Sequence, residues 1–274
     1  MGTLSDFAEN AVVKHLTREA AYSPAATVYL ALCTADPTDA ATGASMSEVA
    51  DSNNYARTAI TLGAASSRRV TQSGTVTFPQ ASGAWGTVTH WAIVTSGTYG
   101  SGDVLASGEL TVSKAVVNGN TPSVASGELW VEITASTGLS TYAANGLLDR
   151  MFRNQAFTVS ANYLAVATAT LSDTTTGSTA TEPSGNNYSR LAINVSGGAQ
   201  PSWAAASSNT VTNANAWVMP TPSGSWGTVV AAFIADASTA GNVLMYDNAG
   251  IVDQLVSSGD TVSYGTGDFD FSQS

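Results

Sequence analysis

The chain has 274 residues, with 20 acidic and 9 basic side chains and a formal net charge of −11. No basic stripe is present, which argues against a nucleic-acid partner, and no run approaches the ~20 apolar residues that cross a bilayer. Only 11% of the residues are charged, against roughly 25% in an ordinary soluble domain. A neutral surface of this kind fits either a member of an assembly or a secreted β protein with a Ser/Thr coat.

One sequence pattern occurs twice in the chain. Residues 53–60, Asn-Asn-Tyr-Ala-Arg-Thr-Ala-Ile, return at 186–193 as Asn-Asn-Tyr-Ser-Arg-Leu-Ala-Ile, with the same landmarks around them in the same order. The repeat predicts two domains, 1–137 (copy one) and 138–274 (copy two), with a boundary near Thr137. Each copy is long enough to form a core of its own.

Each copy opens with a predicted helix. Apolar residues fall at helical spacing between Leu4 and Leu16, after Ser5 as a cap and with Asp6 in the first turn, and again between Leu139 and Phe152. We expect one amphipathic helix of about three to four turns per copy. Its apolar stripe is expected to pack on the sheet of its own copy.

Short strands punctuated by Gly, Asn and Pro make up the rest of each copy. An apolar strand at 28–32 (163–167 in copy two) precedes a long polar loop at 36–54 (170–187), and loops of that length are usually functional or contact-making. The predicted fold is mainly β: two tandem antiparallel β-sandwich domains, each opened by one amphipathic N-terminal helix. Six to eight strands are expected per copy.

The repeated motif is itself a strand that carries a Tyr–Arg pair. Tyr55 and Arg57 lie two residues apart on one strand face, as do Tyr188 and Arg190. In a chain so poor in bases this repetition is selective, and a guanidinium fork takes a carboxylate or several carbonyl groups. The pair is predicted to be a structural clamp that holds the long loop to the sheet. Its candidate partners are Glu48 or Glu128 in copy one and Glu182 or Asp268 in copy two.

Two further sets of residues are candidate sites. Trp85 and Trp226 correspond in the two copies and sit beside glycines, which favours structural anchors, while a sugar-stacking platform formed by other Trp residues in one copy stays open. Acidic residues in or near the long loops are the candidate contact positions: Asp36, Asp39, Glu48, Asp173 and Glu182.

No pattern predicts catalysis, a cofactor or a metal site. The two histidines, His15 and His90, have no Cys or His cluster around them, so both are expected to be structural. Cys33 is the single cysteine and is expected in the core. Arg68-Arg69, the only adjacent basic pair, is interpreted as a solvated turn.

Three stretches of copy one together form a recognisable pattern. They are residues 29–40 (Tyr-Leu-Ala-Leu-Cys-Thr-Ala-Asp-Pro-Thr-Asp-Ala), 54–57 (Asn-Tyr-Ala-Arg) and 85–92 (Trp-Gly-Thr-Val-Thr-His-Trp-Ala). This pattern resembles a family of tailed-bacteriophage virion proteins, often labelled tail fibre or minor structural proteins. The resemblance covers most of residues 4–133 and is weaker in copy two. It implies a place in the particle and brings no catalytic residues with it.

The resulting expectation is a non-enzymatic structural component of a phage particle, assembled in the host cytoplasm. Capsid decoration is favoured over a tail or fibre position, because two compact sandwiches without a fibrous repeat do not make a long shaft. The alternative is a tail or fibre component that binds a receptor or glycan, and a hydrolytic tailspike is third. The expected partners are other virion proteins, and a homo-oligomer, with a trimer favoured, is expected.

Overall fold

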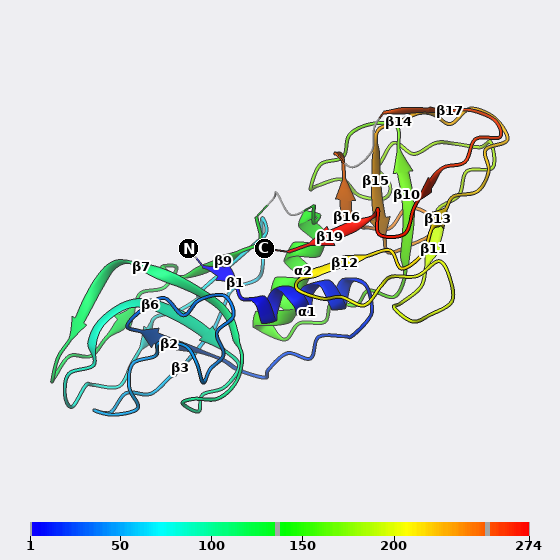
Figure 1. The fold of residues 1–274 in the computed structure, drawn as a ribbon. Coiled ribbons are helices and arrows are strands. Elements are labelled where there is room, and N and C mark those ends of the chain that lie inside the picture. The colour runs from blue at the N-terminus through cyan, green and yellow to red at the C-terminus, as the bar shows by residue number, and fades with distance from the viewer. Residues whose placement is uncertain (1, 135–137, 250–252, 274) are drawn as a thin grey trace.

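The computed structural model describes residues 2–134, 138–249 and 253–273, and it is mainly β with two similar domains and two helices (Figure 1). The elements of copy one are β1 (Thr3–Leu4), α1 (Asp6–Leu16), β2 (Val28–Cys33), β3 (Thr58–Ile60), β4 (Arg69–Thr71), β5 (Val76–Thr77), β6 (Gly86–Val94), β7 (Val104–Val116), β8 (Ser123–Val124) and β9 (Trp130–Glu132). Those of copy two are α2 (Thr141–Arg153), β10 (Asn162–Ala167), β11 (Leu191–Ile193), β12 (Thr210–Thr212), β13 (Trp217–Val218), β14 (Gly227–Val229), β15 (Ala231–Ala235), β16 (Val243–Asp247), β17 (Gln254–Val256), β18 (Ser263–Tyr264) and β19 (Asp270–Ser272). The boundary expected near Thr137 lies outside the described residues, and the division at that point stays a prediction.

Both copies contain a similar arrangement of antiparallel strands. The main sheet has the order β1-β7-β6-β2-β3 in copy one and β11-β10-β15-β16 in copy two. Short two-stranded ladders form the second layer: β4-β9 and β5-β8 in copy one, and β12-β19 and β13-β18 in copy two. The ladders of two or three residues explain why the strands outnumber the six to eight expected, since such short pairs leave little alternation in the sequence.

Each helix begins where its sequence predicts. The Ser5 side chain accepts a hydrogen bond from the Ala8 amide at the start of α1, and Ser140 accepts one from Ala143 at the start of α2. The two serine hydroxyls also donate across to β7 and β16, at the carbonyl oxygens of Val104 and Val243. The N-cap therefore ties each helix to the main sheet of its own copy.

The packing of the two helices differs from the expectation. Both lie in the middle of the molecule, between the two sets of strands (Figure 1), and each contacts both copies: α1 packs against β7 and β12, and α2 against β16 and β4. A single cluster of buried apolar residues runs through both copies and includes both helices. The apolar stripe of each helix therefore joins the two copies instead of covering its own sheet alone.

Contacts between the copies are reciprocal. The His15 side chain lies 2.9 Å from the Phe157 carbonyl oxygen, and the equivalent Arg150 donates to the carbonyl oxygen of Tyr22, the residue equivalent to Phe157. A contact in which position i meets j while j meets i marks a two-fold, isologous interface. The two copies thus associate like the halves of a dimer within one chain.

Four further contacts cross between the copies in an approximately symmetric way. Arg18 donates to the Ile193 carbonyl oxygen and Arg153 to that of Leu62, so the basic position that the helices share reaches the opposite copy each time. Carboxylates also cross between the copies. Asp149 accepts a hydrogen bond from the Ala65 amide, and Glu19 accepts one from the equivalent amide of Ala206.

The turn at Ser67–Arg68 is part of this interface, and its description as solvated is wrong for Arg68. The Arg68 side chain is buried, at 5% exposure, and donates to the carbonyl oxygens of Ile133, Thr134 and Leu139. Arg69 does remain at the surface, paired with Glu132. Guanidinium groups can be buried in this way when carbonyl oxygens satisfy their N–H donors.

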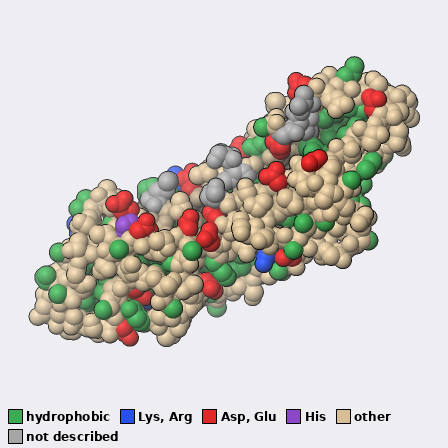
Figure 2. Space-filling view, viewed as in Figure 1, with side chains coloured by type: hydrophobic (Ala, Val, Ile, Leu, Met, Phe, Trp, Pro, Cys, Tyr) green, Lys and Arg blue, Asp and Glu red, His purple; other side chains and the backbone are tan. Residues whose placement is uncertain are grey.

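Acidic side chains outnumber basic ones on the face shown in Figure 2, in agreement with the net charge of −11. No helix in the described part of the chain is long and apolar enough to span a membrane.

Candidate functional site: the clamped contact loops

The repeated motif opens with a tight turn. Asn53 and Asn54 have φ of 51° and 65°, and Asn186 and Asn187 have 50° and 65°, so both copies place two successive asparagines in the left-handed region. Asparagine adopts this conformation more readily than other residues with a side chain. The sequence shows the Asn-Asn pair plainly, but its role as the turn was not assigned from the sequence.

The asparagine side chains fasten this turn to the segment before β6 and its equivalent. Asn53 donates to the Ala84 carbonyl oxygen and Asn186 to that of Ser225. In return, the indole of Trp85 donates to the Asn53 carbonyl oxygen, and that of Trp226 to the Asn186 carbonyl oxygen, each at 2.9 Å. The two tryptophans therefore hold the start of the motif in place.

In copy one, the structure brings together Tyr55, Arg57 and Glu48, the group that we call the clamp. Arg57 donates from Nε to Glu48 Oε1 at 2.9 Å and from Nη2 to Oε2 at 2.8 Å, while the Tyr55 hydroxyl donates to Oε1 at 2.8 Å. The Arg57 and Glu48 side chains are 0% and 2% exposed. A bidentate, water-excluded pair of this kind has a well-defined geometry.

The remaining N–H groups of Arg57 connect two loops. Nη1 donates to the carbonyl oxygens of Ser96 and Ser101, and Nη2 donates to that of Gly43. Gly43 lies in the long loop, whereas the two serines lie in the loop between β6 and β7. A Cβ atom at Gly43 would lie 2.1 Å from the Ser101 carbonyl oxygen, so the loops approach as closely as backbones can.

Copy two repeats the clamp atom for atom with Tyr188, Arg190 and Glu182. Arg190 donates to both Glu182 oxygens and to the carbonyl oxygens of Gly177, Ala237 and Ala240, and the Tyr188 hydroxyl donates to Glu182 at 2.6 Å. The Glu182 side chain is 17% exposed, so this clamp is less enclosed than the first. Of the two candidate acids in each copy, the arginine contacts the one in the long loop.

Each clamp tyrosine also packs on the tryptophan that holds the start of the motif. The rings of Tyr55 and Trp85 meet edge to face at 5.2 Å, and those of Tyr188 and Trp226 at 5.0 Å. Burial, followed by the adjacent glutamate, raises the pKa of both tyrosines well above its usual value. Each hydroxyl therefore stays protonated and acts as a hydrogen-bond donor to the carboxylate.

The other loop acids are engaged in local structure. Asp36 accepts a hydrogen bond from the Thr38 amide, and Asp173 accepts one from the Thr141 hydroxyl at the start of α2. The Asp39 carbonyl oxygen accepts the Asp6 amide at the start of α1. Burial, together with Asp6 and Asp36, raises the pKa of the Asp39 carboxyl. The long loops are thus fastened at both ends, at the helix start and at the clamp.

A buried acid that the sequence reasoning missed lies beside this loop. Glu9 belongs to the buried face of α1, and Asn209 of copy two donates to Glu9 Oε2 at 2.8 Å and to Asp6 at 3.0 Å. Burial, with the charges of Asp39 and Asp6, raises the pKa of Glu9 to about 7. The only signal in the sequence was an acid within the apolar stripe of a helix.

The tryptophans do not form an exposed platform. Trp91, Trp203 and Trp217 are fully buried, Trp85 and Trp226 are nearly so, and Trp130 is half-buried. His15 and Cys33 are also buried, and burial raises the pKa of the Cys33 thiol to about 12, which keeps it protonated and unreactive.

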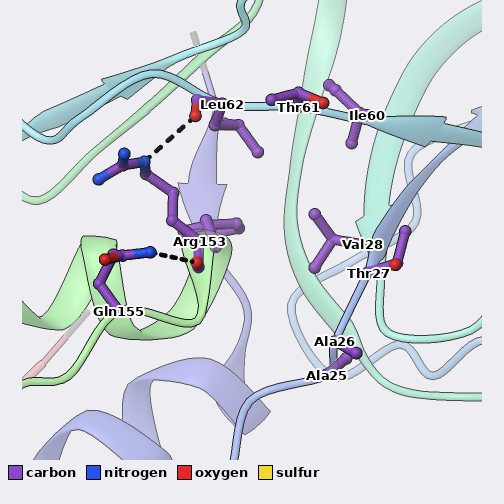
Figure 3. Close-up of a pocket in the computed structure, with 10 residues that line it drawn as sticks. Ala25, Ala26, Thr27, Val28, Ile60, Thr61, Leu62, Arg153 and Gln155 are labelled. Atoms are coloured by element: carbon purple, nitrogen blue, oxygen red, sulfur yellow. Dashed lines mark hydrogen bonds between the residues drawn. The ribbon is translucent and has the colours of Figure 1, made fainter.

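A pocket of about 290 Å³ lies at the junction of the copies (Figure 3). It lies between residues 25–28, the end of β3 and the C-terminal end of α2. Arg153 donates to the Leu62 carbonyl oxygen across its edge, and Gln155 donates to the carbonyl oxygen of Arg153. The side chains of Arg153 and Gln155 are thus engaged with the backbone, so the pocket offers no convergent set of free charged or amide groups.

The arrangement supports rigid presentation of loops. Among the residues that the structure describes, no group of three or more His, Cys, Asp or Glu side chains is arranged to hold a metal ion. The carboxylates of Glu48, Glu182 and Asp173 accept hydrogen bonds within the fold, whereas Asp39 is engaged through its backbone carbonyl oxygen.

Comparison with protein families gives a model that matches the chain twice. The model of the Podophage GP4 fiber I protein gp80 matches residues 3–132 and again residues 138–272. Comparison with curated proteins gives no match. Because the two matches together cover nearly the whole chain, the chain belongs to the Podophage GP4 fiber I protein gp80 family, as a tandem duplication of it.

Proposed function

We propose that the chain is a non-enzymatic component of a phage fibre or tail, which contacts neighbouring virion proteins through its two clamped loops. Membership of a phage fibre family carries this proposal. It makes the protein a virion structural component and favours the tail or fibre alternative over capsid decoration, the position preferred from the sequence alone.

The loops support a contact role. The clamp residues are the same in both copies, whereas the loops that they hold differ: Ala-Asp-Pro-Thr-Asp at 35–39 has no counterpart in copy two beyond Asp173. One rigid scaffold thus presents two different surfaces. Loops held in advance in one conformation lose less conformational entropy when a partner binds.

Enzyme activity is disfavoured by the same geometry. Hydrolysis of a glycosidic bond uses two carboxyl groups that face the substrate. Here Glu48 and Glu182 are bound by arginines, and Asp36 and Asp173 by local donors. The proposed partners are proteins of the particle; assembly in the host cytoplasm and a trimeric state remain part of the proposal.

Labelling of the chain in intact particles tests the position. A gold-labelled antibody against the chain should mark the tail or fibres, with few copies per particle measured by quantitative mass spectrometry. Label spread over the capsid shell, with hundreds of copies, would return the protein to a decorating role. Mass photometry of the purified chain tests the trimer separately.

A further inference from the structure

In copy one, the edge strand β7 of the main sheet and the strand β9 of the second layer lie along a gap, which we call the seam. At one end of the seam, β1 fills the gap. Thr3 and Leu4 pair antiparallel with Ser107 and Ala106 of β7. On the other side, the Gly2 amide donates to the Trp130 carbonyl oxygen of β9 at 2.9 Å, and Gly2 forms a parallel bridge with Val131. Residues 2–4 therefore form a strand inserted between the main sheet and the second layer.

Beyond β1 the same seam is open. A groove of about 780 Å³ lies between β7 and the segment 122–130. Its floor is made of side chains of the apolar core: Leu32, Phe78, Val88, Trp91, Val116 and Leu129. The groove is thus a direct continuation of the slot that β1 occupies.

The wall formed by β7 has unpaired backbone. The ladder between β1 and β7 ends at the pair Thr3–Ser107, so from Gly108 onward the edge of β7 that faces away from β6 has no strand partner in the described ladders. Val112, in this stretch, is 63% exposed. Exposed strand edges of this kind accept an added strand, because their N–H and C=O groups are free to pair.

A buried donor lies at the same place. Trp130 lines the groove, and its indole N–H is buried without a hydrogen-bond partner among the described residues. A buried donor left unpaired is unfavourable, so an occupant with acceptor groups, such as the carbonyl oxygens of a peptide, would be favoured if the ring turned this N–H toward the groove.

Charge on the rim restricts the occupant further. Glu109 and Glu128 line the groove with Lys114 as the only base, and the whole chain carries −11. A second copy of so acidic a chain would be repelled, whereas a basic segment would be attracted.

Copy two has larger side chains at two equivalent positions. Tyr264 stands where copy one has Val124, and Phe269 where it has Leu129; the two rings meet edge to face at 5.4 Å. Tyr264 and Phe269 are aromatic side chains packed into the core, so the molecule itself supplies substitutions that the fold accepts at these positions.

We infer that this groove accepts an extended, basic segment of a neighbouring virion protein, apolar at alternate residues, as a strand that continues the line of β1. The strand runs antiparallel to β7 and parallel to β9, as residues 2–4 do. Its backbone pairs with the edge of β7, its apolar side chains reach the core floor, and its basic side chains meet the two rim glutamates. Only the statement that the bound segment belongs to a virion protein rests on the proposed function.

The test uses the purified chain and two synthetic peptides of alternating valine and threonine, matched in length to Gly108–Val116. One peptide carries a lysine at each end and the other a glutamate. Fluorescence anisotropy should show saturable binding of the lysine peptide, at least about tenfold tighter than the glutamate peptide at low salt. The indole N–H resonance of Trp130, assigned with Trp130→Phe, should shift on binding.

Two variants locate the binding. Val124→Tyr with Leu129→Phe introduces the residues of copy two and should abolish binding without lowering the melting temperature. Thr111→Pro removes an N–H that has no ladder partner and should weaken binding at least about tenfold while the fold is kept. If the double substitution alters the melting temperature, the proline variant still decides the outcome.

Several results would overturn the inference: no saturable binding of the lysine peptide, equal binding to the variants, or equal affinity for the two peptides. An oligosaccharide from a glycan array whose binding is lost in the double variant would assign the groove to a glycan instead. Self-association lost in that variant would assign it to a second copy. Because binding is measured on the purified chain, failure here is distinct from a mistaken position in the particle.

Discussion

Arg57 and Glu48 are joined by two parallel hydrogen bonds of 2.9 and 2.8 Å, with both side chains withdrawn from water. The same arginine donates hydrogen bonds to carbonyl oxygens of two loops, so one side chain determines how the loops meet. The stability of this contact depends on the whole group, because removing one partner leaves the other buried and charged.

Arg57→Ala should lower the free energy of unfolding by about 3–5 kcal/mol, because Glu48 would be left buried without its counter-charge. Arg190→Ala should lower it less, since Glu182 is partly exposed to water. Urea denaturation followed by tryptophan fluorescence measures both. The control is Arg69→Ala, whose partner Glu132 is at the surface, with an expected loss of at most about 1 kcal/mol. Unchanged melting of Arg57→Ala would remove the clamp from the explanation of the fold.

Tyr55→Phe should lower the free energy of unfolding by about 1–3 kcal/mol, because the buried Leu32 amide loses its acceptor and Glu48 loses a donor. The phenyl ring keeps its contact with Trp85, so the loss isolates the hydroxyl. Tyr99→Phe, at an exposed ring, serves as the control and should leave stability unchanged. A loss of the same size in both variants would argue against a specific role of the clamp hydroxyl.

Stability should depend on pH through Glu9. Its pKa is about 7 in the fold, against an ordinary value of 4.5, so between these values the folded chain binds more protons than the unfolded chain. The stabilisation by protonated Glu9 is fully present below about pH 4.5 and is lost as the pH rises through about 7. Glu9→Gln should therefore flatten the fall in stability between about pH 5 and 8 in urea denaturation.

His15 contributes with the opposite sign. Burial lowers the pKa of its imidazole below 6.5, so its contribution is lost as the pH falls through and below 6.5. The difference between wild type and Glu9→Gln therefore isolates the glutamate. If this difference does not change with pH, the proposed titration of Glu9 is wrong.

Gly146→Ala should destabilise the protein although alanine is the better helix former. A Cβ atom at this position of α2 would lie 2.2 Å from the Phe157 ring. The gain in helix propensity is about 1 kcal/mol, and overpacking costs about 1–3 kcal/mol. Phe157→Leu in the same chain should recover part of the loss, as measured by a double-mutant cycle. Net stabilisation by Gly146→Ala would show that the ring is free to move aside.

The whole chain should unfold in one transition, because one apolar cluster runs through both copies. Calorimetry should give equal calorimetric and van't Hoff enthalpies. Two separated transitions, assigned to the two copies by Arg57→Ala and Arg190→Ala, would mean that the copies are independent domains.

Much of the architecture is predictable from the chain alone. The repeat at 53–60 and 186–193, the caps Ser5 and Ser140, and the strand punctuation determine two similar β-rich units, because these signals are local. The shared Tyr–Arg pair is also predictable, since a pattern that occurs twice in a base-poor chain stands out, and the loop glutamate is one of its two candidate partners in each copy.

The tertiary structure decided which groups meet. Local sequence does not distinguish a helix stripe that packs on its own sheet from one that joins two copies, because the apolar spacing is the same in both cases. The choice of Glu48 over Glu128, the burial of Arg68 and the raised pKa of Glu9 likewise depend on residues more than a turn away in the chain. The two similar units and their Tyr–Arg pairs are predictable from the sequence, whereas the acid that each arginine binds depends on the packing, because burial and charge pairing are properties of the assembled chain.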